Sequence, residues 1–304
     1  MTASVLAVIV LYKTSPHASS TSVTTLARTL AAADPGMLRL KVLLFDNSPA
    51  AQGVTGLFEH EEYLSAPSNP GLAEAYNTGI RIAQQEGFDW LLTLDQDTVL
   101  PETFLAELAR AIAVVGPTPE IAAVVPLVQG AGRVLSPYIF RWGALPQWFP
   151  LGYVGVPDTP TYALNSASLL RVDALCQVGG YDPRFWLDAS DHAIFHRMHE
   201  HGKLVYVAGN IQVTHDLSVL SNDQMSVTRY RNVLAAESAF RDLTMNKLAG
   251  WECTSRLLVR LLRQVRGGQA ELVKATCHFL WLRLLHTRRY RLQLWQREIA
   301  ARLK

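Results

Sequence analysis

Short apolar runs recur along the first half of the chain, and each ends in polar residues. Residues 5–11, 41–45 and 91–94 are almost wholly Val, Leu, Ile, Phe or Ala after their first position. Continuous apolar runs of this length are typical of parallel strands that are buried on both faces. Residues 22–33 and 72–85 between them repeat apolar positions at helical spacing. This alternation predicts an α/β fold with a doubly wound, mostly parallel sheet flanked by helices.

Further elements continue the alternation. A short run at 62–65 predicts a third strand, and residues 121–126 predict another. Between them, a helix is expected to begin at Pro101, because proline is tolerated in the first turn of a helix. Residues 130–165, rich in aromatic residues, Gly and Pro, have two interpretations: an irregular segment lining a substrate groove, or a loop capping the core.

Length and charge suggest how the chain is organised. Its 304 residues suit one large α/β domain, predicted as 1–235, with a helical C-terminal appendage, 236–304. Residues 251–304 hold 12 Lys and Arg against 3 Asp and Glu, a net charge of +9, whereas the rest holds 16 against 23. An acidic body with a basic tail indicates an anionic surface as the partner of the tail.

Compartment and membrane signals are few. Cys176, Cys253 and Cys277 form no paired framework, which favours a reducing, cytoplasmic compartment. The apolar run at 5–12 is too short for a membrane span and lacks a basic leader, and no other run reaches the length of a membrane helix.

The most informative motif is Asp95-Gln96-Asp97, which directly follows a predicted buried strand. Ligand sites in open α/β sheets lie at the carboxyl ends of the strands. Two carboxylates there are costly unless neutralised, and Mg²⁺ or Mn²⁺ held by one or two carboxylates completes its shell with substrate phosphates. The motif therefore predicts a metal-bridged diphosphate; the alternative is an ordinary Asp-rich turn.

Two other strands end in polar side chains. Asp46 can accept hydrogen bonds from a nucleobase or a ribose, and Tyr12 can stack on a base. The alternative for Asp46 is a turn residue, because Asp-Asn-Ser-Pro is strong turn chemistry. At Asn69-Pro70-Gly71, small residues would let a helix N-terminus approach an anion, although ordinary helix packing is the preferred interpretation.

An acidic segment follows later in the chain. Asp188 and Asp191 would share one face if the segment is helical, and the aromatic residues before them would raise a carboxylate pKa, as suits a general base. The alternative is that Asp188 caps the helix. His215 follows a short apolar run and is a candidate for contact with a metal or phosphate, although a lone His is more often structural.

In order and spacing, these motifs resemble the family 2 glycosyltransferases of the GT-A fold, over roughly residues 4–235. The resemblance runs from the first strand through NPGLAEAYNTGI (69–80), DQD and GGYD (179–182) to the acidic helix and His215. LTLDQDT and the later YRN at 230–232 are similar to the bacterial rhamnosyltransferase branch.

The resemblance implies roles for individual residues. Asp95 would contact the ribose or the metal, Asp97 would be the principal ligand of Mg²⁺ or Mn²⁺, and His215 would join the metal site. The family's catalytic aspartate lies six residues before an arginine, so Arg197 points to Asp191 as the base, with Asp188 as the second candidate. The residues implied to bind the nucleotide sugar are Tyr12, Asp46, Asn69, Asn77, Asp95 and Gln96.

Two positions depart from the family pattern: Ser190 stands where Glu is frequent, and Asn165-Ser166-Ala167-Ser168 replaces a segment that usually contains Ser-Gly. These departures keep a non-catalytic sugar-nucleotide-binding protein open. The resemblance otherwise implies inverting sugar transfer, with dTDP-L-rhamnose as favoured donor and a growing, lipid-linked bacterial surface glycan as acceptor.

Other enzyme classes lack their motifs. VIVLYKTSP contains neither the Gly-rich, Arg-bearing loop of a nucleotidyltransferase nor the GxGxxG of a dinucleotide oxidoreductase, and no QxxRW marks a processive synthase.

The basic tail alternates Leu and Trp with Arg from Trp251 onward, as in helices that lie on an anionic membrane surface. A peripheral position on the inner face of the bacterial cytoplasmic membrane is therefore expected. The alternative is helices packed on the catalytic domain or in a homodimer. Nucleic-acid binding is disfavoured, because no nucleic-acid module accompanies the charge.

Overall fold

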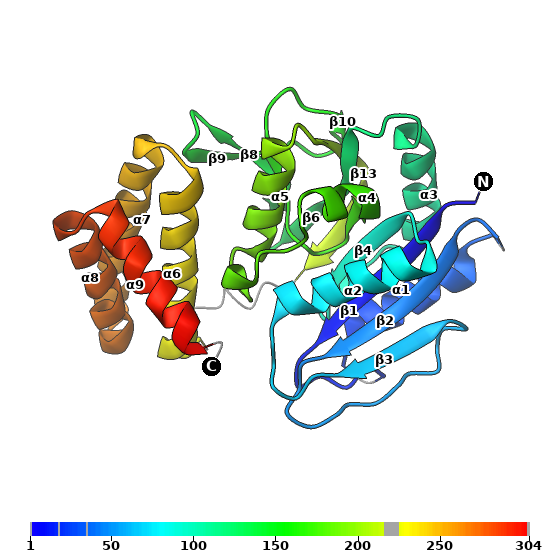
Figure 1. Ribbon diagram of the computed structural model, residues 1–304, viewed down its shortest axis with the longest axis horizontal. Coiled ribbons are helices and arrows are strands. Elements are labelled where there is room, and N and C mark those ends of the chain that lie inside the picture. Colours follow the sequence, from blue (N-terminus) through cyan, green and yellow to red (C-terminus); the bar gives the residue numbers. More distant parts are fainter. Residues whose placement is uncertain (1, 18, 35, 216–224, 303–304) are drawn as a thin grey trace. The chain divides into compact units, whose positions relative to one another are not determined.

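The computed structural model describes residues 2–17, 19–34, 36–215 and 225–302 (Figure 1). The chain divides into two compact units. The first comprises Met1–Ile139 and Trp148–Asp216, and the second comprises Phe140–Gln147 and Leu217–Lys304. The predicted boundary at residue 235 falls inside helix α6 (Val227–Thr244), which packs with the C-terminal helices.

The first unit is built on a mixed sheet with the strand order β10-β13-β6-β12-β4-β1-β2-β3. Strands β3, β2, β1 and β4 are parallel, β12 runs antiparallel to β4 and β6, and β13 is parallel to β6. The bounds are β1 Ser4–Leu11, β2 Arg39–Asp46, β3 Glu61–Ser65, β4 Trp90–Asp95, β5 Thr98–Val99, β6 Ile121–Gly130, β7 Arg133–Ser136, β10 Val154–Gly155, β12 Ser168–Arg171 and β13 Leu204–His215. The predicted mostly parallel α/β sheet is confirmed.

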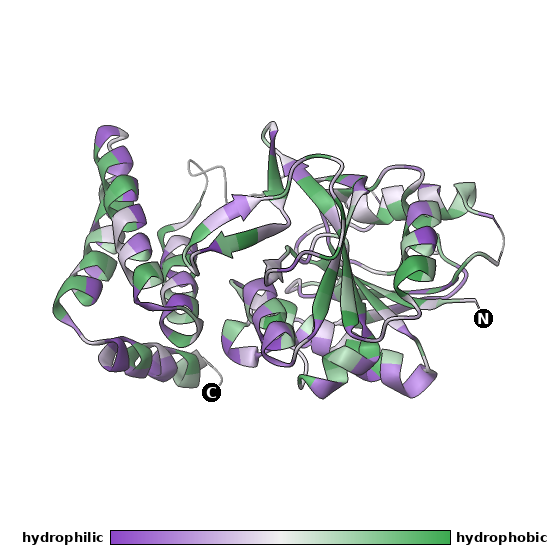
Figure 2. Ribbon diagram, turned by 90° about the horizontal axis from the view of Figure 1, so that it is seen from above, coloured by the Kyte–Doolittle hydropathy of each residue, from purple (hydrophilic) through white to green (hydrophobic). Residues whose placement is uncertain are grey.

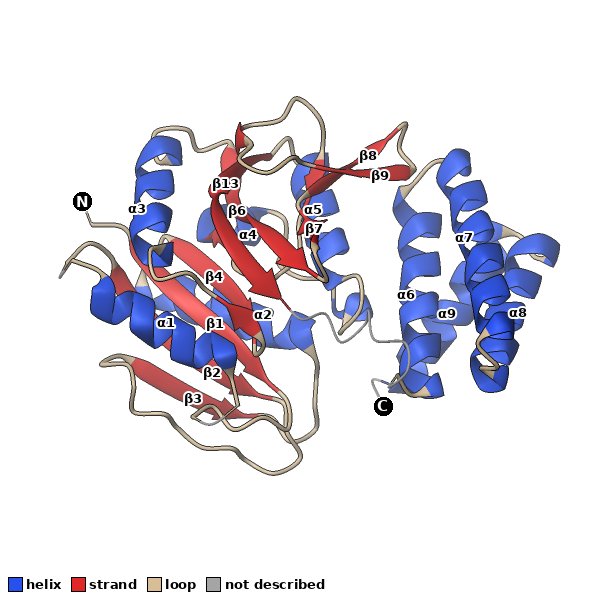
Figure 3. Ribbon diagram, turned by 180° about the vertical axis from the view of Figure 1, so that it is seen from behind, coloured by secondary structure: helices blue, strands red, loops and turns tan. Residues whose placement is uncertain are grey.

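Helices cover both faces of this sheet. Alternate residues of β1 point to opposite faces, so Val5, Ala7, Ile9 and Leu11 share one core with α1 and α3. On the other face, α2 approaches β1 closely at Gly79, where an added Cβ would lie 2.5 Å from Cγ2 of Val8. Figures 1 and 3 show the sheet from opposite faces. The bounds are α1 Thr21–Ala32, α2 Leu72–Glu86, α3 Phe104–Val115, α4 Val172–Gln177, the 3-10 turn η1 Pro183–Phe185 and α5 Ser190–Glu200.

Residues 130–165 are more regular than predicted. They contain β7, β10 and a small separate sheet of β11 (Thr161–Tyr162), β8 (Tyr138–Arg141) and β9 (Leu145–Trp148), in the order β11-β8-β9. The prediction of an irregular segment is wrong here, because the aromatic residues favour strands.

The second unit contains α6, α7 (Lys247–Arg266), α8 (Ala270–Leu285) and α9 (Arg288–Arg302), as expected for a helical appendage. Figure 2 shows apolar and polar residues alternating around these helices. A small apolar core joins α6, α7 and α8, and is formed by Tyr230, Leu234, Leu257, Leu272, Ala275 and Leu280. No helix in the described part of the chain is long and apolar enough to cross a membrane.

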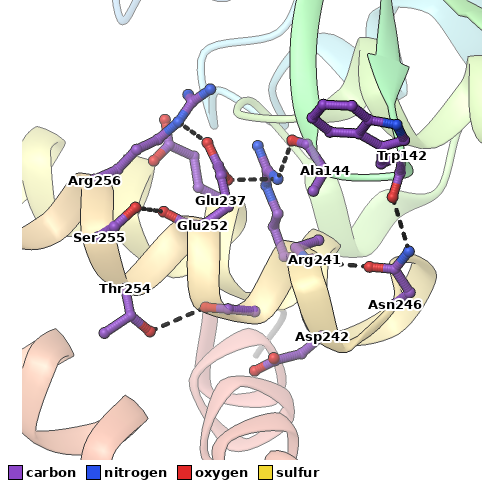
Figure 4. A network of polar contacts seen from close by, with 12 residues as sticks. Trp142, Ala144, Glu237, Arg241, Asp242, Asn246, Glu252, Thr254, Ser255 and Arg256 are labelled. Atoms are coloured by element: carbon purple, nitrogen blue, oxygen red, sulfur yellow. Dashed lines mark hydrogen bonds and ion pairs between the residues drawn. The ribbon is translucent and has the colours of Figure 1, made fainter.

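Within the second unit, polar contacts hold the segment Phe140–Gln147 on α6 and α7 (Figure 4). Arg241 Nη1 lies 2.7 Å from Glu252 Oε2 and donates to the Ala144 carbonyl at 3.1 Å. Arg256 also pairs with Glu252, and Asn246 Nδ2 donates to the Trp142 carbonyl at 3.1 Å. The buried carboxylate of Glu252 is thus paired with two arginines.

Candidate functional site

Three strand ends meet at one edge of the sheet. Leu11 pairs with Asp46, and Val10 pairs with Asp95, in parallel register. Because parallel neighbours end at the same edge, Tyr12, Asp46 and Asp95 follow one another across it. The predicted convergence of polar groups at the carboxyl ends of β1, β2 and β4 is therefore present in the fold.

Asp95 is held by groups from two distant segments. Its Oδ2 accepts a hydrogen bond from the Ser166 hydroxyl at 2.7 Å, and Tyr76 Oη lies 3.5 Å from its Oδ1. Ser166 precedes β12, and its neighbour Ala167 has a φ of 65°, a left-handed conformation that favours glycine. The usual Ser-Gly of the family segment thus has a conformational reason at this position.

Asp95 and Asp191 act on the same two phenols. Tyr76 and Tyr181 are fully buried, with ring centroids 5.1 Å apart. Burial raises the pKa of both phenols well above 10.0, and the negative charges of Asp95 and Asp191 act in the same direction. Both phenols therefore stay protonated, and two carboxylates far apart in sequence influence the same buried pair.

His215 lies between the two aspartates of the DQD motif. The antiparallel pairing of β13 with β5 sets His215 opposite Thr98. His215 Nδ1 is 3.5 Å from Asp97 Oδ1, and Nε2 is 3.9 Å from Asp95 Oδ2. Both separations are within ion-pair distance and are longer than an ordinary hydrogen bond. In the described ranges, no group of three or more His, Cys, Asp or Glu is placed to hold a metal ion by itself.

Tyr12 and Gln96 hold the rim of this edge. The Gln96 side-chain carbonyl accepts a hydrogen bond from the Tyr12 backbone N–H at 2.7 Å. The Tyr12 ring remains 42% exposed, with Lys13 Nζ 5.2 Å from its centroid. Gln96 therefore fixes the backbone from which an exposed aromatic ring projects.

Asp46 is committed to its own loop. It is buried, and its carboxylate accepts hydrogen bonds from the backbone N–H groups of Ser48 at 2.9 Å and Gln52 at 2.8 Å, and from the Tyr63 hydroxyl at 2.5 Å. Burial raises the pKa of Asp46, but these hydrogen bonds outweigh burial and lower the pKa below its ordinary value. The structure thus places Asp46 as the organiser of the loop after β2.

The entry of α2 is occupied by protein groups. Asn77 Nδ2 donates to the Tyr181 carbonyl at 2.9 Å, and its Oδ1 accepts from the Tyr181 N–H at 2.8 Å. The Ala73 N–H donates to the Trp186 carbonyl at 3.1 Å. Asn69 lies in the preceding turn, with a φ of 50°. Asn77 therefore aligns the segment around Tyr181, and α2 presents its first turn to Trp186.

The acidic segment is only partly helical. Helix α5 begins at Ser190, and its N-cap Ala189 has a φ of 58°. Asp188 thus precedes the helix, and the conditional prediction that it shares a helical face with Asp191 does not hold; it is not the N-cap either. Asp191 lies in the first turn, and its Oδ1 accepts from both the backbone N–H and the ring Nδ1 of His192, each at 2.7 Å.

Sequence reasoning did not single out several residues of this site. Ser166 and Tyr76 hold Asp95, and the Tyr181 hydroxyl donates to Asn165 Oδ1 at 2.9 Å. In the sequence, Tyr76 is one member of an apolar helical stripe. Only the fold shows that its hydroxyl lies beside Asp95. Ser166 and Asn165 lie in the segment that departs from the family pattern, which is the one signal that marks them.

Residues 25–154 match the family model of glycosyl transferase family 2. No curated protein matches the sequence. The matched segment contains β2, β4 and the DQD motif, and it ends before the segment of Asp191.

Solved structures share the fold at low sequence identity. A structure of GalNAc-T7 with UDP, GalNAc and Mn²⁺ has a TM-score of 0.53 and 16% identity, covering 78% of this chain and 50% of that chain. TarS 1-349 of S. aureus in complex with UDP-GlcNAc has a TM-score of 0.53 and 14% identity, covering 97% of this chain and 90% of that chain. A longer TarS structure has a TM-score of 0.53 and 14% identity, covering 98% of this chain and 55% of that chain.

The chain therefore spans about half the length of two of these structures. Together with the sheet order, these matches confirm the GT-A-type fold that the sequence predicted.

Proposed function

We propose that this protein is an inverting glycosyltransferase, which moves a sugar from a nucleoside diphosphate to an acceptor hydroxyl. One observation carries the proposal: Asp95 lies at the carboxyl edge of the sheet beside the buried, packed pair Tyr76 and Tyr181, and the negative charge of Asp191 also raises the pKa of both phenols. The match of residues 25–154 to glycosyl transferase family 2 supports it.

Asp191 is the proposed base, with Asp188 as the second candidate. The acceptor hydroxyl gives its proton to Asp191, and the acceptor oxygen forms a bond to the anomeric carbon. The bond from that carbon to the diphosphate breaks, and its electron pair stays on the diphosphate oxygen. Attack from the opposite face inverts the anomeric centre in one displacement.

The side chains at the DQD edge fit a divalent cation. Asp95, Asp97 and His215 lie next to one another and would offer carboxylate and imidazole donors, and donor phosphates would complete the shell of Mg²⁺ or Mn²⁺. When bound, the ion supplies positive charge that stabilises the departing diphosphate. The Mn²⁺ and UDP in the GalNAc-T7 structure support this assignment.

The favoured donor is dTDP-L-rhamnose, on the resemblance of LTLDQDT and YRN to rhamnosyltransferases. A UDP-sugar is the second candidate, because the similar structures hold UDP or UDP-GlcNAc. In either case Tyr12 stacks on the base, Asp46 and Gln96 order the loops around the nucleotide, and Asn69 and Asn77 set the entry of α2.

The proposed acceptor is a growing, lipid-linked bacterial surface glycan, reached from the inner face of the cytoplasmic membrane. Helix α7 supports an anionic membrane surface as partner. Its exposed apolar stripe consists of Leu248, Trp251, Leu258, Leu262 and Val265, and exposed Arg256, Arg263 and Arg266 flank the stripe. A homodimer through this stripe would bring the arginines of two copies together, whereas anionic lipid would neutralise them.

Thermal stabilisation by a panel of nucleoside diphosphate sugars, with Mg²⁺ or Mn²⁺, tests the donor site. One donor should raise the melting temperature of the wild type, and Asp97→Ala should abolish this shift. Asp158→Ala, which removes an exposed carboxylate elsewhere, should keep it. No shift with any donor would contradict the proposal.

Turnover separates an enzyme from a non-catalytic binding protein. With the donor identified and lipid-linked glycan as acceptor, the wild type should release nucleoside diphosphate. Asp191→Asn should bind the donor equally well but transfer no sugar. Donor binding without transfer by the wild type would favour the binding protein.

A further inference from the structure

Asp191 begins a chain of hydrogen bonds inside the first unit. His192 Nδ1 lies 2.7 Å from Asp191 Oδ1, and His192 Nε2 lies 2.5 Å from the hydroxyl of Tyr138. A carboxylate oxygen can only accept, so the imidazole Nδ1 carries the proton that is donated to Asp191 Oδ1, and in that tautomer the Tyr138 hydroxyl donates to Nε2. The order is therefore phenol, imidazole, carboxylate.

The chain distinguishes the two oxygens of Asp191. Oδ1 accepts from both the backbone N–H and the ring Nδ1–H of His192, each at 2.7 Å. From the described residues, no hydrogen bond or ion pair reaches Oδ2. One oxygen is thus fixed by two donors, and the other is left for an external proton.

We propose that Tyr138 and His192 are positioning residues, which hold Asp191 Oδ1 so that Oδ2 receives the proton of the acceptor hydroxyl. This inference rests on the proposed function. The proton moves from the acceptor oxygen to Oδ2, the acceptor oxygen bonds the anomeric carbon, and the diphosphate leaves with its electron pair. His192 keeps its Nδ1 proton throughout, so it orients the base and stabilises its charge without gaining charge itself.

The far end of the chain is held by packing rather than by solvent-exposed contacts. Tyr138 is buried in β8, and its ring stacks on Tyr162 of β11, with centroids 6.2 Å apart and planes at 15°. Tyr162 in turn points its hydroxyl at His196 Nδ1, at 3.0 Å. His192 and His196 lie one turn apart on α5, so two parallel phenol–imidazole pairs form, and only that of Tyr138 leads to Asp191.

This duplication offers a matched control. Tyr138→Phe and Tyr162→Phe each remove one buried hydroxyl from one imidazole, so they should perturb folding alike. If the chain positions the base, only Tyr138→Phe should lower kcat for sugar transfer, by about tenfold, as expected for one lost hydrogen bond. The donor Kd and the acceptor KM should stay unchanged.

Two substitutions at His192 separate positioning from packing. His192→Leu removes both ring nitrogens and should lower kcat about 100-fold. His192→Asn keeps an N–H near the Nδ1 position and should recover most of that loss, although it loses Tyr138. Equal kcat for wild type and His192→Leu, or equal losses in Tyr138→Phe and Tyr162→Phe, would overturn the inference and leave the proposed function intact.

Nitrogen NMR of histidine-labelled protein gives a readout that needs no substrate. The His192 signals should show a protonated Nδ1 and an unprotonated Nε2, and Tyr138→Phe should shift the Nε2 signal while Tyr162→Phe does not. A proton on Nε2 would overturn the chain even where a variant fails to fold. Absence of any transfer by the wild type would instead defeat the proposed function.

Discussion

The carbonyl oxygen of Trp186 occupies the space where a side chain on Gly71 would stand. A Cβ at Gly71 would lie 2.3 Å from that oxygen, and the φ of Gly71 is 91°. The same carbonyl accepts the Ala73 N–H at 3.1 Å, in the first turn of α2. The approach joins the entry of α2 to the segment that leads into α5 and Asp191, so glycine is needed for both space and conformation.

Gly71→Ala should lower the free energy of unfolding by about 3 kcal/mol, because it adds a clash to an unfavourable backbone conformation. Gly87→Ala is the matched control: Gly87 also has a positive φ, 67°, but no atom lies within 4 Å of an added Cβ. It should cost only about 1 kcal/mol. Urea unfolding followed by circular dichroism measures both, and equal losses would show that the Trp186 contact is unimportant.

Much of the fold could be predicted because its signals are local. The apolar runs of β1, β2 and β4 and the helical stripe of α2 mark buried elements directly, and their boundaries differ from prediction by one or two residues. The short strands β8 and β9 were not predicted. Only β8 has a partner farther along the chain, since it pairs with β11 as well as with its neighbour β9.

The site could be predicted only where a strand end marks it. Asp95 ends β4 and Asp97 follows it, and both meet His215 through the pairing of β5 with β13, which no local pattern encodes. The roles of Tyr138 and His192 depend on a contact across 54 residues. Asp188 lies outside the helix because Ala189, directly before α5, has a left-handed backbone conformation. Helix propensity alone does not predict this conformation.

Arg241→Met should destabilise the helical unit by about 3 kcal/mol, because it removes one partner of the buried Glu252 carboxylate. Its side chain is 10% exposed, and it also holds the Ala144 carbonyl. Arg256→Met is the control, since Arg256 pairs with the same carboxylate but is 43% exposed. That loss should stay below about 1 kcal/mol. Urea unfolding gives both values, and equal effects would contradict a buried ion pair.

The loop after β2 should make stability depend on pH through Asp46. The folded state lowers the pKa of Asp46 below 3.8, so its contribution is present above pH 3.8 and is lost as pH falls through the folded value. Asp46→Asn should therefore be less stable than wild type at pH 7, and the difference should shrink below pH 3.8.

Tyr63→Phe tests the cause, because it removes one hydrogen bond to Asp46 and should raise the folded pKa toward the ordinary value. Unfolding free energies at several pH values measure both variants. A difference between Asp46→Asn and wild type that does not change with pH would contradict the assigned pKa.

The apolar stripe of α7 should bind vesicles of phosphatidylglycerol and not of phosphatidylcholine. Trp251 is 73% exposed and Leu262 is 58% exposed, so Trp251→Ser with Leu262→Ser should weaken vesicle binding at least about tenfold. Val114→Ser, at an exposed apolar position of α3, should leave binding unchanged. Co-sedimentation measures the three proteins, and added salt should weaken wild-type binding because arginines contribute to it. If the double variant bound vesicles normally but lost a dimer seen by light scattering, the stripe would be a contact between two copies of the chain.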